Sequence, residues 1–321
     1  VSVGKVEGAI PHFKVALNSN AQVEQFWLSY IDALIRLGRI DDAREALQGS
    51  KASGLKSEKI DQLGVQLSAS APTSVSMSKP SKAQTDGLIA LYTQGKLDEA
   101  LAQGNALAGQ FPNDATIHNI VGAVYSALGR HEEAIISLNK AIELKPDYVE
   151  VHYNLGIGLS SLNKYEDAVI SYNRTIELNP KFADAYYNRG HAFINLEKLD
   201  QSLSDFEMAI NLKPNYPQAC NMLGNVLKEL GRYERSIASY NKAIELKSDY
   251  AEAHYNLGII LNEQSRYEEC IASYYRAIAL EPGYADAYNN LASNFKDLGK
   301  YNESIINYKR AMWIFPNYSE A

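Results

Sequence analysis

The chain resembles itself when it is shifted by 34 residues, and this internal period constrains the fold more than any other feature. One column of the self-alignment holds glycine in five consecutive copies: Gly122, Gly156, Gly190, Gly224 and Gly258. Further columns hold proline (Pro112, Pro146, Pro180, Pro214, Pro282, Pro316), small residues (Ala100, Ala134, Ala168, Ser202, Ser236, Cys270, Ser304) and large apolar residues (Leu138, Tyr172, Phe206, Tyr240, Tyr274, Tyr308). Seven copies follow in phase: 81–114, 115–148, 149–182, 183–216, 217–250, 251–284 and 285–318.

Each copy predicts two helices. Apolar residues recur at helical spacing in two stretches per copy, for example 151–162 and 168–178, with a short polar break between them. Acidic residues such as Glu132 and Glu133 open the second stretch, where they suit the positive end of the helix dipole. Proline closes the copy because it cannot continue the preceding helix. The pattern therefore predicts an all-α stack of antiparallel helix pairs.

The glycine column indicates a close approach between the two helices of a pair. Glycine in a helix interior costs about 1 kcal/mol relative to alanine, so five such positions need a structural reason. We expect the column of small residues, such as Ala168, to face the glycines. A bulky residue at Gly156 should force the pair apart at a cost of roughly 1–3 kcal/mol.

The whole pattern resembles the tetratricopeptide repeat. The shared features are the 34-residue period, a Leu-Gly pair such as Leu155-Gly156, an alanine and an aromatic residue in the second helix, and the closing proline. The resemblance covers residues 115–318 strongly and 81–114 loosely. It implies a right-handed α-solenoid superhelix whose first helices line a concave groove.

The N-terminal part carries the same pattern in degenerate form. We interpret residues 1–68 as a short array with a partial copy at 1–23, a copy at 24–57 and an extra helix at 58–68. Residues 69–82, rich in Ser, Ala and Pro, are predicted to be a linker before the seven copies of 81–318. Residues 319–321 resemble the start of a further copy. Both ends thus fall inside a copy, and we expect the chain to be a piece of a longer protein.

The resemblance also suggests where a partner binds. Asparagine recurs two residues before the column glycine, similar to the asparagine ladder of O-linked N-acetylglucosamine transferases, whose amides hold the backbone of an extended peptide. An amide can donate and accept a hydrogen bond, which matches a peptide unit whatever its side chains. The candidate peptide-binding residues are Asn154, Asn188, Asn256, Asn290, Tyr153, Tyr187, Asn221, Asn225, Tyr255 and Asn289. The alternative hypothesis is that these asparagines bond to neighbouring copies or to water.

Composition argues against several other classes of protein. The net charge is −7, and no basic stripe typical of a nucleic-acid binder is present. Apolar runs are too short for a membrane span. With Cys220 and Cys270 as the two cysteines, the chain is no disulfide scaffold, and a reducing compartment such as the cytoplasm is expected. A removed signal peptide remains compatible with a sequence that begins at Val1.

No motif for catalysis, a metal or a cofactor stands out. His118, His152 and His254 share one column but belong to different stacked copies, so we expect packing or groove-edge roles instead of zinc ligation. Arg189 replaces the usual Leu or Val of its column, and we expect an ion pair with Asp205 on the facing helix. The sequence contains no phosphate-binding loop and no glycine-rich dinucleotide turn. We therefore predict that this chain is not an enzyme and binds no cofactor.

The sequence favours a scaffold or substrate adaptor that binds extended peptide segments of a protein partner. A binding mode for a peptide's terminal carboxylate is not supported, because Glu150, Asp184, Glu252 and Asp286 stand where basic residues would be needed. The alternative function is the acceptor-recruiting N-terminal part of a larger bacterial transferase, with a glycosyltransferase, sulfotransferase or methyltransferase domain outside this sequence. A third hypothesis is self-association through an uncapped end of the array.

Overall fold

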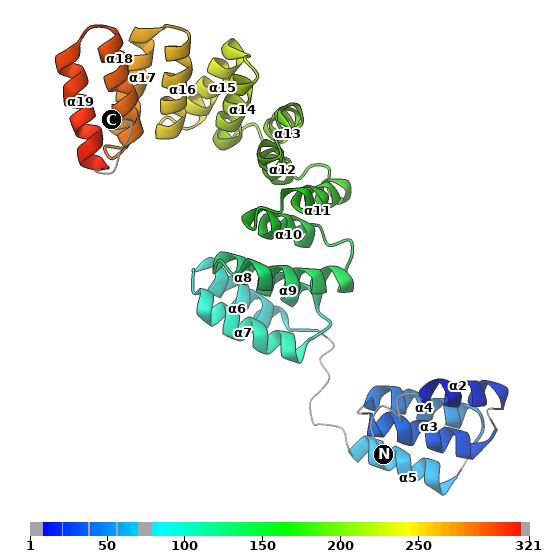
Figure 1. Cartoon of the computed structure of the whole chain (residues 1–321). Helices are drawn as coiled ribbons and strands as arrows, with labels where there is room; N and C mark the ends of the chain where they lie inside the picture. The colour runs from blue at the N-terminus through cyan, green and yellow to red at the C-terminus, as the bar shows by residue number, and fades with distance from the viewer. Residues whose placement is uncertain (1–8, 21, 38, 56, 70–78, 316–321) are drawn as a thin grey trace. The chain divides into compact units, whose positions relative to one another are not determined.

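The computed structural model describes residues 9–20, 22–37, 39–55, 57–69 and 79–315 (Figure 1). Every regular element in these residues is an α-helix, which confirms the all-α prediction. The chain divides into two compact units, an N-terminal unit of residues 1–78 and a C-terminal unit of residues 79–321. The predicted linker lies mostly outside the described residues.

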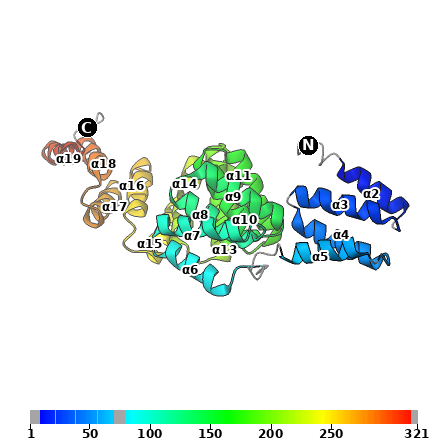
Figure 2. The same cartoon turned by 90° about the horizontal axis from the view of Figure 1, so that it is seen from below.

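The N-terminal unit contains four described helices: α2 (Ile10–Ser19), α3 (Glu24–Arg36), α4 (Ile40–Ala52) and α5 (Glu58–Ala69). They lie side by side in chain order, each in contact with the next (Figure 2). Ile31, Leu34, Ala43 and Leu67 form the buried core between them. Helices α3 and α4 lie within residues 24–57, and α5 begins at Glu58.

Over residues 79–315, the part of the C-terminal unit that the structure describes, seven helix pairs follow one another and confirm the predicted solenoid. The pairs are α6 (Lys82–Thr93) with α7 (Leu97–Gln110), α8 (Ala115–Ala127) with α9 (His131–Leu144), α10 (Val149–Ser161) with α11 (Tyr165–Leu178), α12 (Ala183–Asn195) with α13 (Leu199–Leu212), α14 (Pro217–Glu229) with α15 (Tyr233–Leu246), α16 (Ala251–Glu263) with α17 (Tyr267–Leu280), and α18 (Ala285–Asp297) with α19 (Tyr301–Ile314). Second helices from α9 to α15 end two residues before the position of the proline column, as that column predicts.

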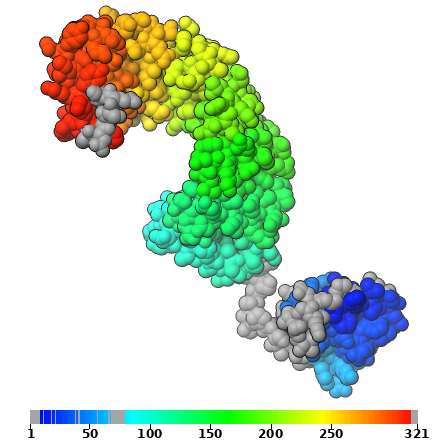
Figure 3. Space-filling model, viewed as in Figure 1, coloured from blue at the N-terminus to red at the C-terminus, as the bar shows by residue number. Residues whose placement is uncertain are grey.

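The first helices of successive pairs lie on the inner side of the stack. They contact one another directly, as in α8–α10, α10–α12, α14–α16 and α16–α18, whereas each second helix packs between the first helices of its own and the next pair. Closer packing on one side curves the stack toward that side. Figure 3 shows the C-terminal unit as a continuous curved body hollowed on one side.

The glycine column faces the large apolar column of the second helix, in addition to the small residues that we expected there. A Cβ atom built at Gly156 would lie 2.5 Å from Tyr172 Cε1, and one at Gly258 would lie 2.5 Å from Tyr274 Cε1. The small column contributes differently, because Ser202 Oγ donates to the carbonyl of Gly190 at 2.9 Å. The glycines therefore make room for an aromatic ring of the facing helix.

The turn between the two helices of a pair requires a left-handed residue. Glycine supplies it in several copies, for example Gly129 with φ 73° and Gly231 with φ 69°. Asn163, Glu197 and Ser265 take the same place with φ 58°, 58° and 57°. Asparagine tolerates this conformation better than glutamate or serine, so Glu197 and Ser265 carry local backbone strain.

Candidate functional site

Each of the four recurring asparagines forms a hydrogen bond to a side chain of the preceding copy. Each amide nitrogen donates to a side chain 35 residues earlier: Asn154 to Asn119 Oδ1 (2.9 Å), Asn188 to the Tyr153 hydroxyl (2.9 Å), Asn256 to Asn221 Oδ1 (3.1 Å) and Asn290 to the Tyr255 hydroxyl (3.1 Å). We call the half-buried face that carries these four amides the ladder surface. One N–H of each amide thus does what the alternative hypothesis expected, because it bonds to a neighbouring copy.

The other polar atoms of these amides remain available. Within the described residues, no hydrogen bond is accepted by the Oδ1 atom of Asn154, Asn188, Asn256 or Asn290. None of these oxygens belongs to the buried polar atoms without a partner. Each amide is therefore oriented by a bond to the preceding copy and keeps an oxygen that can accept a further hydrogen bond.

The tyrosines of the first helices pack between copies. The Tyr153 ring lies 4.8 Å from that of Phe182, and Tyr187 lies 4.9 Å from Tyr216. Tyr255 repeats this arrangement at 4.7 Å from Tyr284. Burial raises the pKa of Tyr153 to about 12, and Asp184 adds to the shift. The Tyr153 hydroxyl, which accepts the hydrogen bond from the Asn188 amide, is thus neutral and can still donate its own proton to another acceptor.

The other three candidates are less accessible. Asn221 is fully buried, where it donates to Glu252 Oε1 at 3.0 Å and accepts from Asn256. Asn225 Oδ1 accepts the Tyr240 hydroxyl at 2.7 Å. Asn289 Oδ1 is buried without a hydrogen-bond partner. The structure thus brings Asn221 and Asn225 into supporting contacts, and Asn221 offers no surface to a ligand.

The ladder is interrupted once, at the middle of the array. Met222 stands in the asparagine column between Asn188 and Asn256. Nearby, Arg189 and Asp205 form the predicted ion pair, with Nη2 and Oδ1 2.6 Å apart, and Arg189 Nη1 also donates to Asn173 Oδ1 at 2.6 Å. We divide the six copies after residue 114 into a front half (115–216) and a rear half (217–318), which begins with the copy that carries Met222.

Two pockets open on the first helices of the front half, and neither was predicted from the sequence. The first pocket, of 240 Å³, is lined by Tyr92, Ala123, Ser126, Ala127, Asn154 and Ile157. The second pocket, of 420 Å³, includes Ile157, Ser160, Ser161, Tyr172, Asn188 and His191. The signal for both is the pair of columns that hold Ser126 and Ala127 in one copy and Ser160 and Ser161 in the next.

Burial also affects the protonation of His191, a residue that lines the second pocket. His191 packs edge-on against Tyr187 and Phe206, with ring centroids 4.6 and 5.5 Å away. This burial lowers the pKa of His191 below its ordinary value, so the imidazole is neutral at pH 7. At the pocket wall, Ser160 Oγ and the Tyr172 hydroxyl lie 3.3 Å apart.

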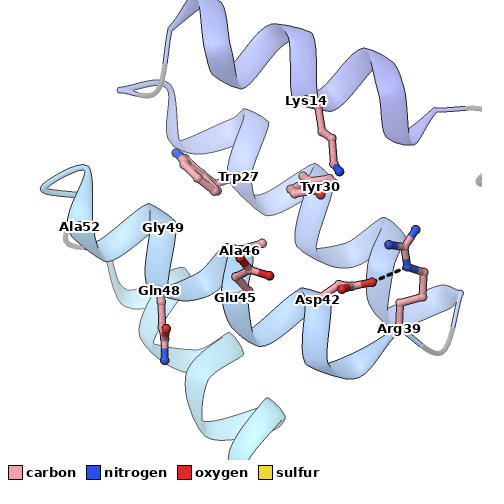
Figure 4. Close-up of a pocket in the computed structure, with 10 residues that line it drawn as sticks. All are labelled: Lys14, Trp27, Tyr30, Arg39, Asp42, Glu45, Ala46, Gln48, Gly49 and Ala52. Carbon is pink, nitrogen blue, oxygen red and sulfur yellow. Dashed lines mark hydrogen bonds and ion pairs between the residues drawn. The ribbon is translucent and has the colours of Figure 1, made fainter. Parts of the chain in front are cut away.

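The N-terminal unit has a pocket of a different kind, with a volume of 530 Å³ (Figure 4). Trp27 and Tyr30 of α3 lie between Lys14 of α2 and the side chains of α4. Gly49 leaves space for the Trp27 ring, because a Cβ atom there would lie 2.7 Å from it. Arg39, Asp42 and Glu45 make this pocket strongly charged, unlike the two pockets of the front half.

The histidine column packs against loops, as the sequence suggested. His118 Nε2 lies 2.9 Å from the Pro112 carbonyl oxygen, and His152 Nε2 lies 2.8 Å from that of Pro146. No group of three or more His, Cys, Asp or Glu residues in the described ranges is arranged to hold a metal ion. No helix in the described part of the chain combines the length and apolar character that crossing a bilayer requires.

Comparison with protein families finds one recurrent similarity. Models described as "TPR repeat" match residues 122–157, 159–196 and 224–264. Models described as "Tetratricopeptide repeat" match residues 1–54, 183–216, 251–284 and 285–318. Together these matches cover more than half of the chain. A comparison with curated protein sequences finds no significant match.

Solved structures show the same fold at low sequence identity. The APC/C hetero-tetramer Cut9–Hcn1 matches with a TM-score of 0.59 and 16% identity, over 98% of this chain and 57% of that chain. PilF of Pseudomonas aeruginosa matches with a TM-score of 0.58 and 16% identity, over 68% of this chain and 96% of that one. A tetratricopeptide repeat protein of Parabacteroides merdae matches with a TM-score of 0.57 and 17% identity, over 74% of this chain and 94% of that one.

Proposed function

Because the chain belongs to the tetratricopeptide repeat family, whose arrays act as protein-interaction scaffolds, we propose that its C-terminal unit binds an extended peptide segment of a protein partner on the ladder surface. The observation that carries this proposal is the set of four amides, each oriented by one bond to the preceding copy and each with an unused acceptor. Because these amides recur once per copy, they suit a ligand whose hydrogen-bonding groups also recur regularly, and a peptide backbone is such a ligand.

The proposed mechanism is bidentate pairing of amides with peptide units. Each Oδ1 accepts a backbone N–H of the ligand, and the second amide N–H donates to a backbone carbonyl. A single bond contributes about 0.5–1.5 kcal/mol net, so affinity requires several in register. The inter-copy bonds hold Asn154 and its equivalents in place before binding, which lowers the entropy lost when the complex forms.

Charge near the ladder favours a neutral or mildly basic peptide. Asp184 and Glu252 lie in the first turns of α12 and α16. Asp184 pairs with Lys213 at 3.2 Å, and Glu252 accepts hydrogen bonds from Asn221 and Tyr250, so both carboxylates are already partly compensated. The buried free thiols Cys220 and Cys270 fit a reducing compartment such as the cytoplasm, where we place this function.

A peptide array tests this proposal. The full chain is screened against overlapping peptides, and binders are measured again with Asn154, Asn188, Asn256 and Asn290 changed together to alanine. We expect binding to fall below detection while helicity by circular dichroism is retained. Matched controls are Asn139→Ala and Asn241→Ala, which remove exposed asparagines from second helices. Unchanged binding in the fourfold variant, or no binder at all, would contradict the proposal.

A further inference from the structure

The two pockets of the front half are the same site repeated one copy apart. Ala123, Ser126, Ala127, Asn154 and Ile157 of the first pocket correspond, 34 residues later, to Ile157, Ser160, Ser161, Asn188 and His191 of the second. Ile157 belongs to both pockets and forms the wall between them. Each pocket is bordered by one ladder asparagine, so a peptide backbone held by the ladder passes over both openings.

The linings of both pockets lack ionised groups. No Asp, Glu, Lys or Arg lines either pocket, and His191 is kept neutral by burial. A charged ligand side chain would lose its hydration there without gaining a counter-charge, which costs several kcal/mol. The rear half differs, because the columns of Ser126 and Ala127 hold Lys228 and Glu229 in the copy 217–250.

The two pockets differ in size and in polar atoms. The first has a volume of 240 Å³ and the second 420 Å³. In the first, Ser126 Oγ is buried and has no partner within the described residues, because Leu138 stands where the next copy has Tyr172. In the second, Tyr165 and Tyr172 supply two aromatic rings, whereas Tyr92 supplies one in the first. The first pocket thus suits a compact side chain and the second a ring.

We propose that the partner peptide inserts two uncharged side chains into the front half, a compact aliphatic residue or threonine in the first pocket and an aromatic residue in the second, three positions apart. This proposal rests on the function proposed above and specifies its ligand. The spacing follows from geometry: neighbouring packed helices lie about 8–10 Å apart, and a peptide in the polyproline II conformation advances about 3.1 Å per residue with three residues per turn, so that residues i and i+3 face the same side. Residues i and i+3 therefore match the distance between the openings.

A displayed library of unbiased peptides tests the proposal with the full chain. We expect the selected peptides to share a Val, Leu, Ile or Thr and an aromatic residue at positions i and i+3, in one of the two orders, without Asp, Glu, Lys or Arg at either. Synthetic peptides with spacings i+2 and i+4, or with lysine in place of the aromatic residue, should bind at least about tenfold more weakly, since filling the pocket with an apolar side chain contributes about 1.5–3 kcal/mol.

Pocket-filling variants give the matched test on the protein. Ser161→Phe fills the second pocket and Ala127→Phe the first, both from exposed positions at helix ends. We expect each to weaken the selected peptide about ten- to a hundredfold, and Ser161→Phe to leave unchanged a peptide with alanine in place of its aromatic residue. Thr93→Phe is the control, because it lies in the same column one copy earlier, is exposed and lines neither pocket.

The outcomes separate this inference from the function beneath it. If peptides bind and the fourfold asparagine variant abolishes binding, but the pair is absent or Ser161→Phe has the effect of Thr93→Phe, the pocket assignment is wrong and the backbone function stands. If the selected side chains are acidic or basic, the assignment is also wrong. If no peptide binds, both proposals fall.

Discussion

The front half and the rear half of the array carry the same asparagine hydrogen bonds, but the residues that flank these asparagines differ. In the front half Asn154 bonds to an asparagine of the preceding copy and Asn188 to a tyrosine, and in the rear half Asn256 and Asn290 repeat this order. The donor–acceptor distances agree within 0.2 Å, from 2.9 to 3.1 Å. Elements that would hold a peptide backbone are thus the same in both halves.

The residues that flank the ladder differ between the halves. Small and polar residues at 123, 126, 127, 160 and 161 open pockets in the front half. The rear half places Lys228, Glu229, Glu263, Lys296 and Asp297 in the corresponding columns. We therefore expect the columns that both halves share to hold the backbone of the bound peptide, and the columns that differ to select its side chains.

The largest effect is expected at the junction between the halves. Changing Arg189 to leucine leaves Asp205, 4% exposed, without its partner, and should destabilise the fold by about 3–5 kcal/mol. The double variant Arg189→Leu, Asp205→Ser restores the pair that other copies carry, as in Leu155 and Ser171, and should unfold near the wild-type denaturant midpoint. Urea unfolding followed by circular dichroism measures both, and equal midpoints for the single and double variants would contradict the assignment.

A second prediction concerns a feature that both halves share. Gly156→Ala and Gly258→Ala should destabilise the array equally, by about 1–3 kcal/mol, because the added Cβ meets a buried tyrosine ring at 2.5 Å. Gly190→Ala should cost less, because its Cβ would lie 3.1 Å from Phe206. Thermal unfolding of the three variants checks this order. A larger loss at Gly190 than at Gly156 would break the rule that the ring sets the spacing.

The third prediction concerns the ladder itself. Asn154→Ala in the front half and Asn290→Ala in the rear half should each weaken a peptide that spans the array by about 0.5–1.5 kcal/mol. Because the two positions lie four copies apart, their effects should add in the double variant. Isothermal titration measures the four affinities. If one half contributes nothing, the peptide occupies the other half alone.

The smallest expected effect is a pH dependence of peptide binding at the second pocket. The pKa of His191 is lowered by burial, so its neutral form stabilises the fold fully above the ordinary pKa of about 6.5, and this stability is lost as the pH falls through that value toward the lowered pKa. Binding of an aromatic side chain in the second pocket should therefore weaken by less than about tenfold between pH 7 and pH 5. His191→Gln should remove this dependence.

The sequence was sufficient to predict the helices and their order. The 34-residue period, the proline column and the polar breaks predict the helix ends of the C-terminal unit, because prolines and turn residues end helices through local effects on the backbone. That a Cβ atom at Gly156 would meet the Tyr172 ring first depends on the direction of the tyrosine side chain, which an alignment of the copies does not contain. Likewise the bond from Asn188 to Tyr153 depends on the rotation between copies, so the sequence left open whether the amides bond to the protein or to a ligand.

The pockets were beyond prediction for a related reason. Small residues at 126, 127 and 161 mark missing volume, but whether a neighbour fills that volume depends on how Ile157 and His191 of the next copies pack. The burial of Asn221 was also hidden, because its column holds tyrosine in other copies and exposed amides look the same in sequence.

The most direct test of the account is an NMR titration of the deuterated, ¹⁵N-labelled chain with an array-selected peptide, in which the side-chain amide signals are followed. Single Asn→Ala variants assign the signals of Asn154, Asn188, Asn256 and Asn290. The account predicts that all four amide pairs shift on binding, while exposed Asn139 and Asn241 do not. Binding that leaves the four ladder amides unmoved would contradict it.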